Sequence, residues 1–158
     1  MSCAMRKTGI SVGLVGMIVA LFLLVVVPAY AADCPQPGDM IEATIDVRPG
    51  SYPNPINLGS QGVVPVALLG NAVFDVATVD MSTVLFHPMG RCEQAAAPQR
   101  YALTDVNSDG YPDLIFHFVT QEVGFQPGDT AACLHGTLFT GEHFCGHDAI
   151  SIVPGGGA

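Results

Sequence analysis

The chain has 158 residues, of which 49% are hydrophobic, and it carries 14 acidic against 5 basic side chains. A formal net charge of −9 disfavours nucleic acid and anionic lipid as partners, because binding to either depends on basic side chains. The same balance attracts divalent cations, although many exported proteins are acidic without binding a metal.

The N-terminal segment has the features of a secretory signal peptide. Arg6 and Lys7 precede an uncharged apolar run over residues 10–27, which is followed by Pro28-Ala29-Tyr30-Ala31. This pattern predicts a signal peptide over residues 1–31, cleaved after Ala31, and a secreted, periplasmic or cell-surface protein. The alternative is that the apolar run is retained as a membrane anchor, since it is long enough to span a bilayer.

Four cysteines follow the predicted leader: Cys34, Cys92, Cys133 and Cys145. An even number of cysteines in an oxidising compartment predicts two disulfides, with three possible pairings. We favour Cys133–Cys145, because these cysteines lie in consecutive strand-like segments, and this leaves Cys34–Cys92. Closing the short loop between Cys133 and Cys145 is expected to stabilise the fold by about 3 kcal/mol.

Most of the remaining chain alternates between short apolar segments and turns. Residues 40–47 alternate in polarity as a half-buried strand does, and residues 48–55 break it with three prolines and a glycine. Residues 62–69 form an apolar strand in which Pro65 predicts an edge position or a bulge. Further strands are predicted at 84–86, 101–103, 114–119, 131–139 and 149–153. About seven strands predict an all-β domain over residues 32–153, an antiparallel immunoglobulin-like β-sandwich, with a flexible tail at 154–158.

A candidate calcium loop lies between two of these strands. It reads Asp105-Val106-Asn107-Ser108-Asp109-Gly110-Tyr111-Pro112-Asp113, with side-chain oxygens at loop positions 1, 3, 5 and 9. Gly110 stands at position 6, where a calcium loop turns sharply, and the Tyr111 carbonyl would supply position 7. Calcium prefers six to eight oxygen ligands, so the predicted ligands of Ca²⁺ are Asp105, Asn107, Asp109, Tyr111 and Asp113.

The loop is not that of an EF-hand. Position 12 is Phe116, where an EF-hand has a bidentate glutamate, and the following residues favour a strand over a helix. The shorter loop resembles those of dockerins, thrombospondin type 3 repeats and FG-GAP repeats. The alternative interpretation is an Asx-rich turn without a metal, because Asn, Asp and Gly favour turns in any case.

A second metal site is a weaker hypothesis. In a strand, His143, Cys145 and His147 would share one face, with His135 on a neighbouring strand, and these ligands suit zinc or copper. A disulfide at Cys145 competes with this hypothesis. His87 and His117 are interpreted as structural or surface residues.

The order of several segments resembles a largely uncharacterised family of exported bacterial domains. These domains begin with a signature of the form IDIKPGSxPNxIN, which residues 45–57 match except for Arg48 in place of lysine and Val47 in place of isoleucine. The similarity continues through residues 62–70, 74–76 and the 105–113 loop, where Asn107 replaces a common aspartate, and ends near 148–153. The resemblance implies an immunoglobulin-like sandwich and no enzymatic activity.

The sequence contains none of the common catalytic motifs, so we expect that the protein is not an enzyme. The expected function is that of a secreted calcium-binding module that interacts with an extracellular protein or polysaccharide. The alternative is a carbohydrate-binding module or a small secreted hydrolase with a site on loops such as residues 49–60.

Overall fold

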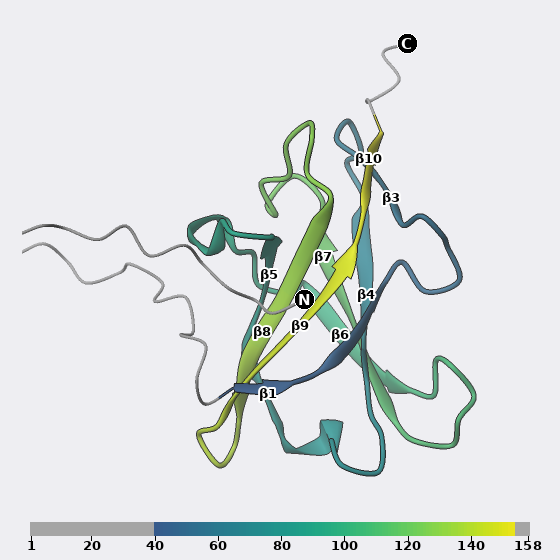
Figure 1. Cartoon of the computed structure of the whole chain (residues 1–158), viewed down its shortest axis with the longest axis vertical. Helices are drawn as coiled ribbons and strands as arrows, with labels where there is room; N and C mark the ends of the chain where they lie inside the picture. Colours follow the sequence, from purple (N-terminus) through teal and green to yellow (C-terminus); the bar gives the residue numbers. More distant parts are fainter. Residues whose placement is uncertain (1–39, 154–158) are drawn as a thin grey trace, which may run out of the picture.

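The computed structural model describes residues 40–153, and the predicted signal peptide, Cys34 and the C-terminal tail lie outside this range. Two four-stranded sheets pack face to face (Figure 1). One has the order β1-β9-β8-β5 and the other the order β2-β4-β7-β6. The prediction of an all-β, antiparallel β-sandwich is therefore confirmed.

The first sheet consists of β1 (Met40–Glu42), β9 (His143–Ala149), β8 (Ala131–Leu138) and β5 (Val79–Pro88). The second consists of β2 (Thr44–Val47), β4 (Val63–Leu69), β7 (Asp113–Val119) and β6 (Arg100–Thr104). A small parallel pair joins β3 (Pro55–Asn57) to β10 (Ser151–Val153). Two short 3₁₀ turns, η1 (Val76–Thr78) and η2 (Cys92–Gln94), precede β5 and β6.

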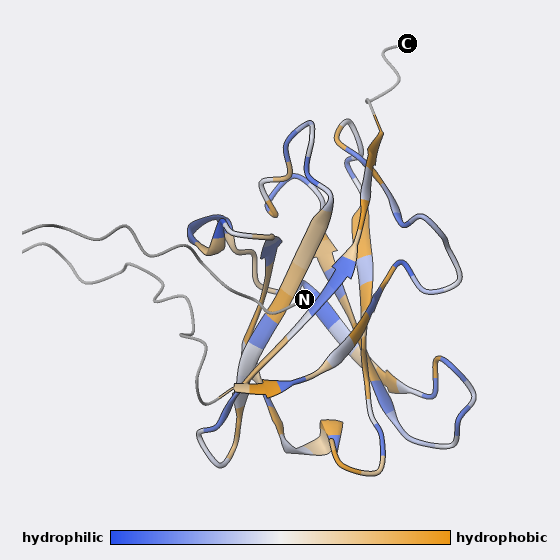
Figure 2. Ribbon diagram, in the orientation of Figure 1, coloured by the Kyte–Doolittle hydropathy of each residue, from blue (hydrophilic) through white to orange (hydrophobic). Residues whose placement is uncertain are grey.

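The alternating residues of the two sheets form one core between them. Figure 2 shows hydrophobic residues concentrated on the strands and hydrophilic residues on most of the connecting loops. Aromatic rings dominate the centre, where Phe86 packs on Phe118 with ring centroids 4.9 Å apart. The largest fully buried side chains include Phe86, Phe116, Phe118, Phe144, Leu68, Leu114 and Leu134.

Three of the predicted strands differ in the structure, and the one expected at 149–153 is only the short β10, since Ala149 belongs to β9. The single strand expected over residues 40–47 divides at Ala43, so that β1 pairs with β9 of one sheet and β2 with β4 of the other. The chain crosses between the sheets at this point and closes one side of the sandwich. The strand expected at 84–86 is part of the longer β5, whose pairing with β8 is interrupted by a bulge between Asp80 and Leu85.

The edge position or bulge predicted from Pro65 is wrong, because β4 lies between β2 and β7 and pairs with β7 without a register shift. The register explains why proline is tolerated there. β2 ends at Val47, which is opposite Val66, so no residue of β2 lies opposite Pro65. The Pro65 carbonyl instead accepts the N–H of Arg48 at 2.8 Å, and the missing N–H of Pro65 removes no hydrogen bond from the ladder.

The signature segment that follows β2 is held by buried hydrogen bonds. Asn54 is only 4% exposed, and its Nδ2 donates to Asp148 Oδ2 at 2.9 Å and to the Ala149 carbonyl at 2.8 Å. Asp148 Oδ2 also accepts the N–H of Val47 at 2.8 Å. The side chain of Asn54 and the N–H of Val47 therefore attach the loop to β9, which gives Asn54 a structural role.

Candidate calcium loop

Residues 105–112 connect β6 to β7 at the end of the sandwich that also carries the connection from β4 to β5 and the β8–β9 hairpin (Figure 1). The ladder between β6 and β7 ends at the pair Thr104 and Asp113, so both ends of the loop are fixed by the sheet. Ser108 and Gly110 have φ angles of 61° and 90°, in the left-handed region. Glycine tolerates this conformation readily, and the two residues curl the chain into a compact turn.

Three side chains of the loop accept backbone N–H groups of the loop itself. Asp105 Oδ2 accepts from Gly110 at 3.0 Å, Asn107 Oδ1 from Asp109 at 3.0 Å, and Asp109 Oδ1 from Tyr111 at 2.9 Å. Asn107 Nδ2 also donates to Asp109 Oδ2 at 2.8 Å. All of these bonds are local, and those of Asn107 and Asp109 join residues two apart, as in an Asx turn.

Asp113 has a different environment from the other predicted ligands. Its side chain is 0% exposed, Oδ1 accepts the N–H of Gly70 at 2.8 Å, and Oδ2 accepts the N–H of Val106 at 2.7 Å. These two backbone N–H groups hold the Asp113 carboxylate in one position. Asp113 therefore anchors the loop to the end of β4, and each of its oxygens retains a second lone pair.

Gly70 fixes the position of the loop from the other side. A Cβ atom at Gly70 would lie 2.2 Å from the carbonyl oxygen of Pro112, so the two segments approach more closely than any side chain permits. The sequence analysis did not identify Gly70 as part of the site. A glycine at the end of an apolar strand was the available signal, because such a glycine often marks a close approach of another backbone.

No group of three or more histidine, cysteine or acidic side chains in residues 40–153 is arranged to hold a metal ion. The predicted ligand set, however, also includes an amide oxygen and a backbone carbonyl, from Asn107 and Tyr111. All five donors are oxygens, which suits a hard cation such as calcium and not a transition metal. The hydrogen bonds of the loop are equally those of an Asx-rich turn, so the geometry is compatible with both interpretations.

The histidines and cysteines considered for a second site share the outer face of the other sheet. His135 lies opposite Cys145, and Cys133 lies opposite both His147 and His87. His87 Nε2 is 3.1 Å from His135 Nδ1. Although the strands bring these residues together, they form no metal-holding cluster within the described part of the chain.

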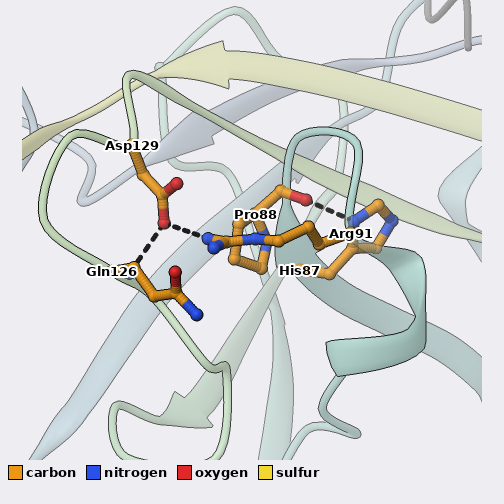
Figure 3. A network of polar contacts seen from close by, with 5 residues as sticks. All are labelled: His87, Pro88, Arg91, Gln126 and Asp129. Carbon is orange, nitrogen blue, oxygen red and sulfur yellow. Dashed lines mark hydrogen bonds and ion pairs between the residues drawn. The ribbon is translucent and has the colours of Figure 1, made fainter. Parts of the chain in front are cut away.

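His87 is buried and has a structural contact at its other ring nitrogen, as Figure 3 shows. Its Nδ1 is 2.8 Å from the carbonyl oxygen of Pro88. In the same region Arg91 forms an ion pair with Asp129, whose Oδ2 also accepts the N–H of Gln126 at 2.8 Å. This network ties the turn after β5 to the loop before β8.

The Sγ atoms of Cys133 and Cys145 are 2.7 Å apart on adjacent strands. The strand placement expected for this pair is therefore present, while the covalent bond stays a prediction. Cys92 is buried and disulfide-bonded. Its predicted partner, Cys34, lies outside the described residues.

Two titratable groups outside the loop have perturbed pKa values. Partial burial and then the nearby charge of Asp148 raise the pKa of Asp46 above its ordinary value of 3.8. Partial burial and then the charge of Arg100 lower the pKa of His117 below 6.5. Neither group lies in the 105–113 loop, so these shifts concern folding stability and not metal binding.

Comparisons with known proteins give no relative: no protein-family model, no curated protein and no solved structure matches the chain. Within residues 40–153, no helix is both long and apolar enough to cross a membrane.

Proposed function

We propose that this protein is an exported, calcium-binding β-sandwich module without enzymatic activity, which acts by binding an extracellular protein or polysaccharide. The observation that carries the proposal is the arrangement of Asp105, Asn107 and Asp109. Their side chains turn into one exposed loop through the hydrogen bonds to Gly110, Asp109 and Tyr111. Metal ligands in short calcium loops need this orientation, with oxygens directed to a common centre.

Calcium in this loop would have a structural effect. The carboxylates of Asp105 and Asp109 repel each other across a tight turn, and a divalent cation neutralises this repulsion. An ion that binds only the folded state stabilises it by about 2.7 kcal/mol when its concentration is a hundred times Kd. β7 begins directly at Asp113, so an ion in the loop would hold β6 and β7 in register. We propose a constitutive structural ion, because extracellular calcium would keep a site of modest affinity filled.

The proposal includes the two disulfides Cys34–Cys92 and Cys133–Cys145, together with cleavage of residues 1–31. Both features belong to an oxidising compartment outside the cytoplasm. An extracellular location also accounts for the metal, because calcium there is abundant enough to keep a site of modest affinity filled.

Calorimetric titration of calcium into the EDTA-treated protein tests the proposal. The proposal predicts one ion per chain and loss of binding in Asp109→Ala. Asp80→Ala is the matched control, because Asp80 Oδ1 likewise accepts the N–H of a residue two positions on, Ser82, at 3.0 Å, but within β5 and outside the loop. Equal calcium binding by Asp109→Ala and by the unaltered protein would contradict the assignment.

A further inference from the structure

A cavity lies directly against the candidate calcium loop. Its volume is about 340 Å³, it is open to solvent, and it is lined by Tyr111 and Pro112 on one side and by the connection from β4 to β5 on the other. Phe74 contributes an apolar surface, since its buried ring also packs on Phe144 with centroids 5.7 Å apart. The cavity therefore combines a rigid apolar wall with one wall formed by the loop itself.

The polar groups of the cavity have unused hydrogen-bonding capacity. Asn71 Oδ1 accepts the N–H groups of Val73 and Phe74 at 2.9 and 3.1 Å, and these bonds do not use the two hydrogens of the Asn71 amide. Asp75 Oδ1 accepts the N–H of Ala77 at 2.9 Å and leaves Oδ2 as an acceptor. The same backbone hydrogen bonds hold both side chains in place, so the donor and the acceptor are oriented before any ligand arrives.

The side chain of Tyr111 adds an aromatic surface that is 43% exposed. A neutral sugar ring presents hydroxyl groups at its edge and C–H groups on its faces. The edge matches an amide donor beside a carboxylate acceptor, and the face matches an aromatic ring. The acidic surface of the protein disfavours anionic ligands, and a mixed polar cavity of this size does not suit a lipid chain.

Three contacts connect the cavity to the calcium loop. The Tyr111 carbonyl is a predicted calcium ligand, and the Tyr111 side chain lines the cavity. The Pro112 carbonyl packs against Gly70, and the Gly70 N–H donates to Asp113 at 2.8 Å. An ion in the loop would therefore fix the backbone of Tyr111, a residue that lines the cavity.

We infer that this cavity is a calcium-dependent binding subsite for one neutral sugar residue of a glycan, with Tyr111 as the stacking surface and Asn71 and Asp75 as hydroxyl partners. The inference rests on the proposed calcium site. It assigns a ligand class, a neutral sugar residue, to the cavity beside that site. It places the polysaccharide contact at the calcium end of the sandwich, away from the signature loop at residues 48–54.

Saturation-transfer NMR with the methyl glycosides of mannose, galactose, glucose and N-acetylglucosamine, in calcium and in EDTA, tests the inference. The expected result is signal transfer for at least one glycoside in calcium and its loss in EDTA. Tyr111→Ala is expected to weaken binding by about tenfold or more, from loss of the aromatic contact. Asp75→Asn, which keeps an oxygen for Ala77, is expected to weaken it as well.

Tyr52→Ala is the matched control, because Tyr52 is 91% exposed on the loop at the opposite end of the sandwich. Calorimetry on the same samples separates this inference from the proposed function. Calcium binding without signal transfer from any of the four glycosides would overturn the sugar subsite and leave the calcium site intact. Signal transfer that persists in EDTA, or that Tyr111→Ala does not reduce, would also overturn it.

Discussion

Replacing Asp113 with asparagine tests how the loop is attached to the sandwich. The carboxylate is fully buried and accepts two backbone N–H groups, from Gly70 at 2.8 Å and from Val106 at 2.7 Å. Asparagine has nearly the same shape but only one acceptor oxygen, so one buried N–H loses its partner. An unsatisfied buried donor costs about 1–3 kcal/mol.

Asp113→Asn is therefore expected to lower the free energy of unfolding by about 1–3 kcal/mol even without calcium. Asp113→Ala removes both acceptors and is expected to cost about 2–6 kcal/mol, a large part of the stability of a small domain. Urea unfolding in EDTA measures both values. Asp109→Asn is the control, since its hydrogen bonds are exposed to solvent and its replacement should cost less than about 1 kcal/mol. Equal stabilities of Asp113→Asn and the unaltered protein in EDTA would refute the anchoring role.

Three further predictions follow from other contacts. Gly70→Ala should lower the unfolding free energy by about 1–3 kcal/mol and weaken calcium binding, because its Cβ would lie 2.2 Å from the Pro112 carbonyl oxygen. Gly62→Ala is the control and should do neither, because its Cβ would meet only the Ser60 hydroxyl, at 3.3 Å. Equal effects of the two variants in calorimetry and urea unfolding would contradict this prediction. Asp46→Asn should raise the melting temperature at pH 7 and leave it unchanged near pH 3. The pKa of Asp46 is raised in the folded state, so the folded protein loses stability as pH rises above 3.8 and the carboxyl group ionises. A lower melting temperature of the variant at pH 7 would show instead that the carboxylate stabilises the fold. Peptide mass mapping of the exported protein should find Cys133 joined to Cys145, and reduction should lower the melting temperature; free thiols at both positions would exclude the bridge.

The sequence predicted the sandwich because its longer strands are apolar segments bounded by turn residues. β4, β7 and β8 are runs of seven or eight mostly apolar residues, and each was predicted within one residue of its observed bounds. The three-residue strands β1, β3 and β10 are too short to show a period. The division of residues 40–47 at Ala43 is a tertiary effect, since the two halves pair with different sheets.

The site could be predicted only in part. The sequence predicted a tight loop over residues 105–113, and Asp105, Asn107 and Asp109 do make local hydrogen bonds within it, while their role as calcium ligands stays a prediction. The burial of Asp113 depends on Gly70, which is 43 residues away in the chain, and no local pattern reports that contact. The cavity beside Tyr111 was missed for the same reason, since its two walls come from separate connections between strands.

Calcium binding by the loop over residues 105–113 can be settled by titration. Calcium is titrated calorimetrically into the EDTA-treated protein, into Asp109→Ala and into Asp80→Ala. The account predicts one ion per chain for the unaltered protein and for Asp80→Ala, no binding for Asp109→Ala, and a higher melting temperature wherever calcium binds. No heat and no thermal shift in the unaltered protein would reduce the loop to an Asx-rich turn and contradict the account.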